Sequence, residues 1–167
     1  IEVGSGNGEN LISLASKNKK KIIIGIEPFK NGLVNTADTC LKTGIKNIYL
    51  YPYVFERFKE KFKNFICDEF YILFPDPWPK KRHHKRRLVN FKFLEFVLTK
   101  IRKKGLIFFA TDNSDYFLNV YSLLKEMKKN MNFSYKKLAQ SSLIVTKYHR
   151  RAKKLGNKVN FLKIEKF

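Results

Sequence analysis

A glycine-rich turn near the start of the chain has the composition of a nucleoside-binding loop. Gly4, Gly6 and Gly8 alternate with small polar residues directly after the short strand expected at residues 1–3. Glycine has no Cβ, so the backbone of such a turn can approach a ligand at the carboxyl end of a strand. Glu27 ends the next apolar stretch, about 20 residues after the turn, where a carboxylate accepts hydrogen bonds from both hydroxyls of a ribose. The pattern predicts a site for a cofactor that contains a nucleoside.

The acidic residue before the turn distinguishes between two classes of cofactor. Glu2 lies at the end of the first apolar strand, where a fixed carboxylate faces whatever the turn binds. A carboxylate repels the pyrophosphate of a nicotinamide dinucleotide and attracts a sulfonium or an amino group. The two acids therefore favour S-adenosylmethionine. On these residues alone, a dinucleotide-binding turn with a solvated Glu2 remains an alternative.

A second candidate site lies at Phe74-Pro75-Asp76-Pro77-Trp78-Pro79, which follows another apolar strand. Prolines on both sides of Asp76 fix φ and so present its carboxylate in a defined place at the strand tip. That carboxylate can accept hydrogen bonds from the N1 and N2 donors of a guanine. Trp78 either stacks on a base or packs on its own loop, and both alternatives stay open. A rigid acid beside an aromatic ring is suited to a purine.

The residues from Lys80 to Arg87 form a strongly basic run. Six of these eight residues are cationic. Each phosphate that such a run neutralises releases counterions, which gives affinity for nucleic acid with little sequence information. A basic run is alternatively a solvated loop or a nuclear-localisation signal, but its position directly after Asp76 favours the docking of RNA beside this acid. The side chains expected to meet the nucleic-acid backbone are Lys81, Arg82, Lys85, Arg86 and Arg87.

These candidate residues lie at the ends of elements that alternate between short apolar strands and longer amphipathic helices. Strands are expected at residues 1–3, 21–27, 46–51, 69–74 and 105–112. Helical spacing of apolar residues covers residues 9–18, 30–43, 54–64, 90–103 and 114–129. Such alternation predicts an α/β fold whose mostly parallel sheet has helices on both faces. The shorter segments 133–138, 141–148 and 159–167 predict a C-terminal antiparallel hairpin at the edge of the sheet.

The composition is that of a single folded domain with a polyanionic partner. Hydrophobic residues make up 44% of the 167 residues and aromatic residues 15%, which is enough for one core and excludes a disordered chain. Lys and Arg number 35 against 14 Asp and Glu, so the formal net charge is +21 and nucleic acid is the first candidate partner. Part of the lysine excess is alternatively a consequence of genomic base composition.

Several classes of protein are disfavoured by what the sequence lacks. Cys40 and Cys67 form no CxxC motif and have no His at ligand spacing, so we expect a reduced, intracellular protein without a metal site. No apolar run approaches the roughly 20 residues of a membrane span, and there is no signal-peptide pattern. We therefore expect a cytoplasmic protein that has no membrane partner.

Five segments taken together resemble a known family. They are EVGSGNGE from residue 2, GIEP from residue 25, LFPDPWPKKRHHKRRL from residue 73, FATD from residue 109 and TKYHRRAKKLG from residue 146. In this order and spacing they resemble the tRNA (guanine-N7)-methyltransferase family along nearly the whole chain. The resemblance implies one methyltransferase domain over residues 1–167 with a Rossmann-like class I fold. Because the chain begins at Ile1 inside a strand and without Met, we expect that it lacks an N-terminal segment of the natural protein.

The resemblance also implies roles for individual residues, with S-adenosylmethionine as the cofactor, tRNA as the partner and Asp76 as the catalytic residue. The residues implied to contact the cofactor are Glu2, Gly4, Gly6, Gly8, Glu27 and Asp76. The residues implied to contact the guanosine, in the variable-loop region of tRNA, are Lys80, Asp112, Thr146, Lys147 and His149.

Methyl transfer to N7 of a guanine needs positioning more than proton transfer. N7 carries an exposed lone pair and no proton, so the reaction requires no general base. In-line alignment of the reacting atoms lowers the barrier, and carboxylates such as Asp76 and Asp112 stabilise the positive charge that arrives on the purine. Because N7 lies in the deep, narrow groove of A-form RNA, the target is expected in a loop or out of its stack.

Two positions depart from the family's pattern. His149 stands where the family usually has an acid, and residues 52–55 around Val54 contain no acid where members commonly contact the adenine of the cofactor. A catalytically degenerate tRNA-binding protein with the same fold is therefore an alternative. The acid between prolines at Asp76 is also found in methyltransferases that act on an amino group, but Asp-Pro-Trp in place of Asn/Asp-Pro-Pro-aromatic disfavours this second alternative. The other acids of the pattern are retained, which favours an active enzyme. The sequence leaves open the target nucleotide, the oligomeric state and the need for a second subunit.

Overall fold

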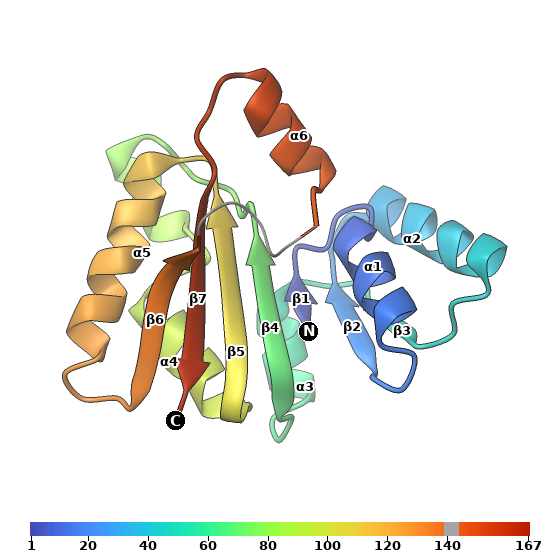
Figure 1. Cartoon of the computed structure of the whole chain (residues 1–167), viewed down its shortest axis with the longest axis horizontal. Coiled ribbons are helices and arrows are strands. Elements are labelled where there is room, and N and C mark those ends of the chain that lie inside the picture. The colour runs from blue at the N-terminus through green and yellow to red at the C-terminus, as the bar shows by residue number, and fades with distance from the viewer. Residues whose placement is uncertain (139–143) are drawn as a thin grey trace. The chain divides into compact units, whose positions relative to one another are not determined.

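Three parallel strands form the sheet of the N-terminal unit, residues 1–65. In the computed structural model, which describes residues 1–138 and 144–167, the chain divides into two compact units after residue 65. The elements of the first unit are β1 (Glu2–Val3), α1 (Glu9–Lys17), β2 (Ile23–Ile26), α2 (Lys30–Thr43), β3 (Ile48–Tyr51) and α3 (Phe55–Lys61). β2 pairs in parallel with both β1 and β3, so the strand order is β3-β2-β1 (Figure 1).

Helices cover both faces of this sheet. Leu11 and Ala15 of α1 are buried in a cluster that Leu50 of β3 packs against. The next residue of β3, Tyr51, points to the opposite face, because side chains alternate along a strand. There its ring meets Phe58 of α3, with 5.3 Å between the ring centroids. α1 and α3 therefore lie on opposite faces, as the alternation of elements predicts.

The C-terminal unit, residues 66–167, has a four-stranded sheet that is parallel at one edge and antiparallel at the other. Its elements are β4 (Cys67–Leu73), the 3-10 helix η1 (Lys81–Arg86), α4 (Phe91–Lys100), β5 (Ile101–Thr111), α5 (Ser114–Met127), β6 (Phe133–Leu138), α6 (Lys147–Lys154) and β7 (Asn160–Lys166). β4 and β5 are parallel, and β7 is antiparallel to both β5 and β6. The order within this unit is β4-β5-β7-β6 (Figure 1).

α4 and α5 pack on one face of the strands of the C-terminal unit. Phe93 of α4 meets the ring of Phe70 in β4, and Tyr116 of α5 meets the ring of Phe109 in β5, at centroid distances of 6.2 and 5.6 Å. Phe70 pairs with Ile107, two residues before Phe109, so these strand residues share a face. All five side chains are buried, and their packing fixes where β4 and β5 end.

Both helices begin at asparagine caps. The side chain of Asn90 accepts a hydrogen bond from the backbone N–H of Phe93, and that of Asn113 accepts one from Tyr116. Each cap satisfies a backbone donor that the first turn of a helix leaves without a partner. Asn113 follows Asp112, so the cap also fixes the chain directly after the end of β5.

All of the strands and helices expected before residue 131 are present, and the largest difference in a boundary is at the start of β5. Ile101 was expected inside a helix ending at residue 103, but it is the first residue of β5 and pairs with Cys67. The pairing then shifts to Glu69 with Leu106, and Lys104 between these points has φ 62°. Ile101 is buried in the strand, so its apolar side chain fits a helical period and a strand equally well.

The two C-terminal strands pair antiparallel as expected, but their connection contains a helix. Within the segment 141–148, residues 141–143 lie outside the described residues, and Lys147 and Tyr148 begin α6 instead of belonging to a strand. Figure 1 shows α6 beyond the carboxyl ends of β4 and β5. In the part of the chain that the structure describes, no helix combines the length and the apolar character that a membrane crossing needs.

Candidate functional site

The glycine turn between β1 and α1 is folded tightly and leaves open space on one side. Gly4 donates its N–H to the carbonyl of Ile26 at 2.8 Å, which ties the turn to the end of β2. Gly8 has φ 73°, and a Cβ there would lie 2.4 Å from Oγ1 of Thr36, so only glycine fits. Gly4 has φ 72°, yet a Cβ there would meet nothing within 4 Å. The turn is therefore closed against α2 at Gly8 and accessible to a ligand at Gly4.

Glu27 is fixed to this turn by two backbone hydrogen bonds. Its Oε2 accepts from the N–H of Gly6 at 2.8 Å, and its Oε1 accepts from the N–H of Phe29 at 3.0 Å. The residue is buried, and each carboxylate oxygen keeps a further lone pair. The Oγ of Ser5 is also buried and has no hydrogen-bond partner among the described residues. The side chains of this unit thus fit a polar ligand such as the ribose of a nucleoside.

Glu2 is the most strongly perturbed acid of the N-terminal unit. It is buried and accepts a hydrogen bond from Nδ2 of Asn10 at 3.2 Å. Burial raises the pKa of Glu2 from 4.5 to about 8, and the charge of Glu27 adds to the rise, while the hydrogen bond from Asn10 opposes it. The carboxyl group is therefore protonated at neutral pH. A cation placed beside it favours the ionised form.

Asp76 lies in an irregular turn directly after β4. The turn is anchored by Phe74, which donates its N–H to the carbonyl of Ala110 at 2.8 Å and has φ 53°. Asp76 itself is exposed. Trp78 is half-buried, has φ 41° and packs on the basic run, with its ring 5.8 Å from that of His83 and 4.9 Å from Cζ of Arg86. The alternative in which Trp78 packs on its own loop is thus the arrangement seen here.

The basic run forms η1, and its cationic side chains fall into two groups. Lys80, Lys81, Arg82, Lys85 and Arg86 are exposed, as expected for residues that meet a nucleic-acid backbone. Arg87 is different, since it is only 4% exposed. Its predicted contact with RNA phosphate stays a prediction, and the structure gives its guanidinium other partners.

Arg87 links the turn after β4 to helix α5. Its Nε donates to the carbonyl of Pro77 at 2.9 Å, and its Nη2 donates to Oδ2 of Asp115 at 2.5 Å. The guanidinium also stacks on Tyr116, with Cζ 4.7 Å from the ring centroid. The hydrogen bond from Arg87 lowers the pKa of Asp115. Pro77 follows Asp76, so this buried cation holds the backbone that presents the acid.

Asp112 lies at the end of β5, next to the end of β4. Because β4 and β5 are parallel neighbours, Asp76 and Asp112 follow strands that end at the same edge of the C-terminal sheet. Oδ2 of Asp112 accepts a hydrogen bond from Nδ2 of Asn157 at 3.2 Å. Asp112 is thereby joined to the segment that follows α6.

The segment at Thr146 forms the start of α6. Thr146 is the N-cap, and its Oγ1 accepts a hydrogen bond from the N–H of His149 at 3.3 Å, so the hydroxyl caps the helix. Lys147 is exposed. His149 is 1% exposed, its ring lies 5.5 Å from that of Phe161, and its Nδ1 has no hydrogen-bond partner among the described residues. Burial, followed by the charge of Lys153, lowers the pKa of His149, so the ring is neutral at neutral pH.

Sequence reasoning did not find the residues that support these groups. Asn10, Asp115, Tyr116 and Asn157 have ordinary residue types at positions where nothing in the spacing marks them. Each is recognisable only through its contact with Glu2, Arg87 or Asp112 in the folded chain. Among the residues that the structure describes, no three His, Cys, Asp or Glu side chains are grouped to hold a metal ion.

Comparisons with known proteins identify the family. The sequence profile of a family described as "Putative methyltransferase" matches residues 1–162. A tRNA (guanine-N(7)-)-methyltransferase of Wolbachia pipientis wMel is 37% identical over 98% of this chain and 73% of its own length. The chain belongs to the tRNA (guanine-N7)-methyltransferase family. A second member, from Buchnera aphidicola subsp. Baizongia pistaciae, is 33% identical over 99% of this chain and 70% of its own length.

Solved structures of other methyltransferases share the fold of this tRNA (guanine-N7)-methyltransferase family member. A putative methyltransferase from Streptococcus mutans, solved in complex with SAH, has a TM-score of 0.67 at 12% identity, over 99% of this chain and 87% of that chain. A putative rRNA-methylase from Clostridium thermocellum has a TM-score of 0.68 at 12% identity, over 99% and 86%. These likenesses confirm the expected Rossmann-like class I fold.

The two departures from the tRNA (guanine-N7)-methyltransferase pattern lie in ordinary local structure. Val54 is the exposed N-cap residue of α3, and Tyr53 beside it stacks with Arg57 at 5.1 Å from the ring centroid. His149 lies in the first turn of α6, where it is buried between aromatic rings. With these residues in place, α3 begins directly after Val54 and α6 contains His149.

Proposed function

We propose that this protein transfers a methyl group from S-adenosylmethionine to N7 of a guanine in tRNA. The observation that carries the proposal is the turn after β4, where an exposed Asp76 precedes the exposed cations of η1. The carboxylate of Asp76 can accept hydrogen bonds from the N1 and N2 donors of a guanine, and the cations of η1 beside it attract the phosphate backbone. The names of the relatives support the same activity. A tRNA substrate implies that the protein acts in the cytoplasm.

The N-terminal unit provides the groups that suit the cofactor. The open side of the turn at Gly4 admits a ligand close to the backbone, and Glu27 is held where its free lone pairs can accept from the ribose hydroxyls. The neutral Glu2 ionises when a cationic amino or sulfonium group comes close. S-adenosylmethionine, when bound, supplies the activated methyl group. The roles proposed for Glu2, Glu27 and the glycines are to bind and orient it, with Asp76 as a further contact.

The C-terminal unit provides the groups that suit the guanosine. Asp76 and Asp112 lie at the same edge of the sheet, so their carboxylates stabilise the positive charge that a purine gains on N7 methylation. Neither acid needs to accept a proton from N7. Lys80, directly before η1, and Lys147, the first residue of α6, are exposed. We propose that these two lysines meet the nucleotide, while the cap residue Thr146 and the buried His149 fix the start of α6.

Asp76→Asn tests the proposed chemistry. The amide keeps the size of the side chain but removes its charge, so kcat for methylation should fall by about 100-fold or more. The affinity for tRNA should stay close to the wild-type value, because η1 is unchanged. The measurement is transfer of labelled methyl from S-adenosylmethionine to an unmodified tRNA transcript, with nucleosides identified by mass spectrometry.

The matched control is Asp38→Asn, which removes an exposed carboxylate from α2 and should leave turnover unchanged. A wild-type protein that binds S-adenosylmethionine and tRNA but forms no N7-methylguanosine would contradict the proposal. A wild-type protein that binds tRNA but does not bind S-adenosylmethionine would instead support a tRNA-binding protein that has lost catalysis.

A further inference from the structure

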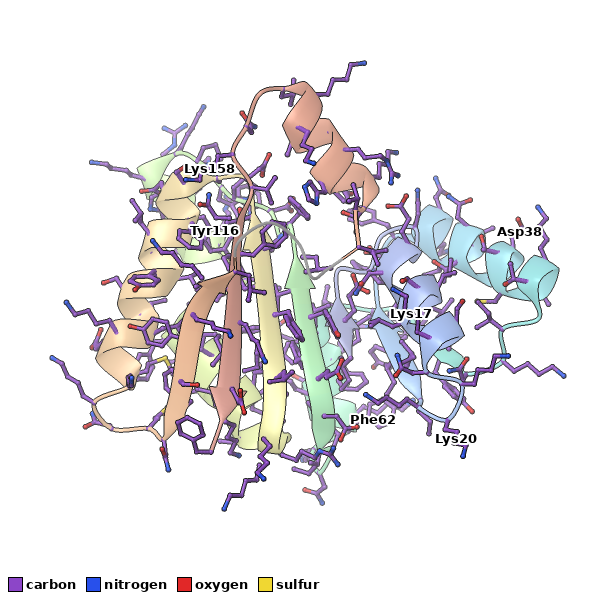
Figure 2. The ribbon with its side chains drawn as sticks, viewed as in Figure 1. Lys17, Lys20, Asp38, Phe62, Tyr116 and Lys158 are labelled. Carbon is purple, nitrogen blue, oxygen red and sulfur yellow. The ribbon has the colours of Figure 1, made fainter. Side chains whose placement is uncertain are left out.

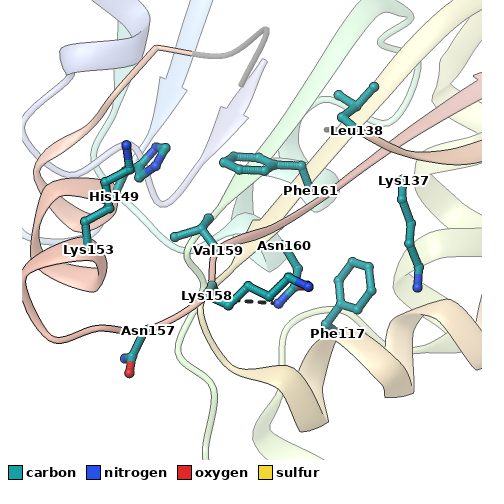
Figure 3. A pocket seen from close by; sticks show the side chains of 10 residues that line it. All are labelled: Phe117, Lys137, Leu138, His149, Lys153, Asn157, Lys158, Val159, Asn160 and Phe161. Atoms are coloured by element: carbon teal, nitrogen blue, oxygen red, sulfur yellow. Dashed lines mark hydrogen bonds between the residues drawn. The ribbon is translucent and has the colours of Figure 1, made fainter. Parts of the chain in front are cut away.

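A cavity of about 540 Å³ lies within the C-terminal unit, between α5, β6, α6 and the start of β7. Figure 3 shows His149 and Lys153 on one side, Phe117 and Lys137 on the other, and Val159 with Phe161 between them. This volume is in the range of pockets that hold a small ligand, about 300 to 1,000 Å³. Among the lining residues that the structure describes, His149 alone has a role predicted from the sequence.

The charge of the cavity favours an anion. Lys137, Lys153 and Lys158 line it, and no acidic residue is among the lining residues that the structure describes. Nζ of Lys137 lies 5.3 Å from the ring centroid of Phe117, so its ammonium group is held at the wall by an aromatic face. Three cations without a neutralising carboxylate attract a phosphate group more strongly than a neutral ligand.

The walls also favour an aromatic ring with polar edges. Phe117 and Phe161 are buried aromatic residues that line the cavity, and His149 lines it beside Phe161. Nδ1 of His149 is buried without a hydrogen-bond partner among the described residues. A buried polar atom of this kind is normally satisfied, and the edge of a nucleobase can provide the missing partner.

The position of the cavity relates it to the guanosine contacts. Asn157 lines the cavity and donates to Asp112, the acid at the end of β5. We infer that the cavity binds a second nucleotide of the RNA, next to the methylated guanosine, with its phosphate on the lysines and its base against the aromatic wall. This inference rests on the proposed function, because it assumes that the substrate is tRNA.

Two variants with different physical effects test the cavity. Val159→Phe fills part of it without a change in charge, and Lys153→Ala with Lys158→Ala removes two exposed cations. Each should raise the Kd for tRNA and the KM for tRNA by about tenfold, the size of one lost stacking contact, with kcat close to wild type. The lysine double variant should also reduce the slope of log K against log salt by about 2.

The matched control removes two exposed lysines outside the cavity, Lys125→Ala with Lys129→Ala, and should bind tRNA nearly as wild type does. Binding is measured by fluorescence anisotropy of labelled tRNA, and turnover by methyl incorporation. Binding of S-adenosylmethionine and a thermal melt check that each variant is folded. If Val159→Phe destabilises the protein, the double lysine variant, whose changes are exposed, decides the result.

The outcome separates the cavity from the proposed function. Wild-type formation of N7-methylguanosine tests the function alone. If both cavity variants bind tRNA as tightly as the lysine control, the inference is overturned, whether or not the wild type methylates. If the wild-type protein does not methylate tRNA but the cavity variants lose tRNA binding, the inference that the cavity binds a nucleotide is supported and the proposed reaction is contradicted.

Discussion

At the scale of single residues, Arg87 shows that a cation within a basic run can hold the turn beside it in place. Its guanidinium contacts the Pro77 carbonyl, Asp115 and the face of Tyr116. Lys has no planar fork and cannot make these contacts together. Arg87→Lys should therefore let the turn after Asp76 move, and a displacement of about 1 Å costs up to about 100-fold in kcat.

Steady-state kinetics at several salt concentrations measure the effect of Arg87→Lys. We expect kcat to fall while the salt dependence of tRNA binding keeps its slope. Arg86→Ala is the matched comparison, since Arg86 is exposed on η1 and its loss should raise KM and reduce the slope by about 1. If Arg87→Lys changes only KM and the slope, Arg87 meets phosphate, as the run of cations predicts.

Glu2 gives a residue-scale prediction about pH. Burial raises its pKa to about 8 in the folded chain, above its ordinary value of 4.5. Between these values the unfolded chain has released a proton that the folded chain keeps, so the free energy of unfolding falls as the pH rises from about 5 to 8, by at most about 5 kcal/mol. Below this window both states are protonated, and above it both are ionised.

Urea denaturation of the cofactor-free protein between pH 5 and 8.5 measures this dependence. Glu2→Gln removes the titrating group and should flatten the curve, whereas the exposed Glu126→Gln should follow wild type. A Glu2→Gln protein that keeps the wild-type decline would show that another group is responsible.

At the scale of elements, the sequence predicts strands and helices well where apolar periodicity is long and caps are present. α4 and α5 begin after Asn90 and Asn113, whose side chains accept from the first turn. The start of β5 was missed because Ile101 is buried in either conformation. α6 was missed because it is short and almost entirely polar, and its start is fixed by the Thr146 cap.

The site residues that follow predicted strands could be predicted from the sequence, but their tertiary contacts could not. The positions of Glu27, Asp76 and Asp112 at strand ends could be predicted from the sequence because each follows an apolar run. The buried state of Arg87 and His149 could not be predicted. It depends on Pro77, Asp115 and Phe161, which are distant in sequence or unremarkable in type, so only the folded chain shows that two of the expected RNA contacts are packed inside the protein.

At the scale of the whole molecule, the formal net charge of +21 raises the question of how many cations act on RNA. The exposed lysines include Lys17, Lys20 and Lys158, which Figure 2 labels, so exposed charge is not confined to η1. If the affinity for tRNA were due to total charge, any four exposed cations would contribute equally. If it depends on contact with phosphate, those of η1 contribute more, because they follow the strand end that carries Asp76.

Two variants with the same change in charge decide between these cases. Replacement of Lys81, Lys85, Arg82 and Arg86 by Gln should reduce the slope of log K against log salt by about 3, since each released phosphate contact contributes about 0.7 to 0.9. Replacement of Lys17, Lys19, Lys20 and Lys46, exposed residues at the end of α1 and in the segments before β2 and β3, should leave the slope nearly unchanged. Equal reductions in both variants would mean that tRNA responds to the overall field of the protein, and that the lysine excess reflects composition more than a defined RNA surface.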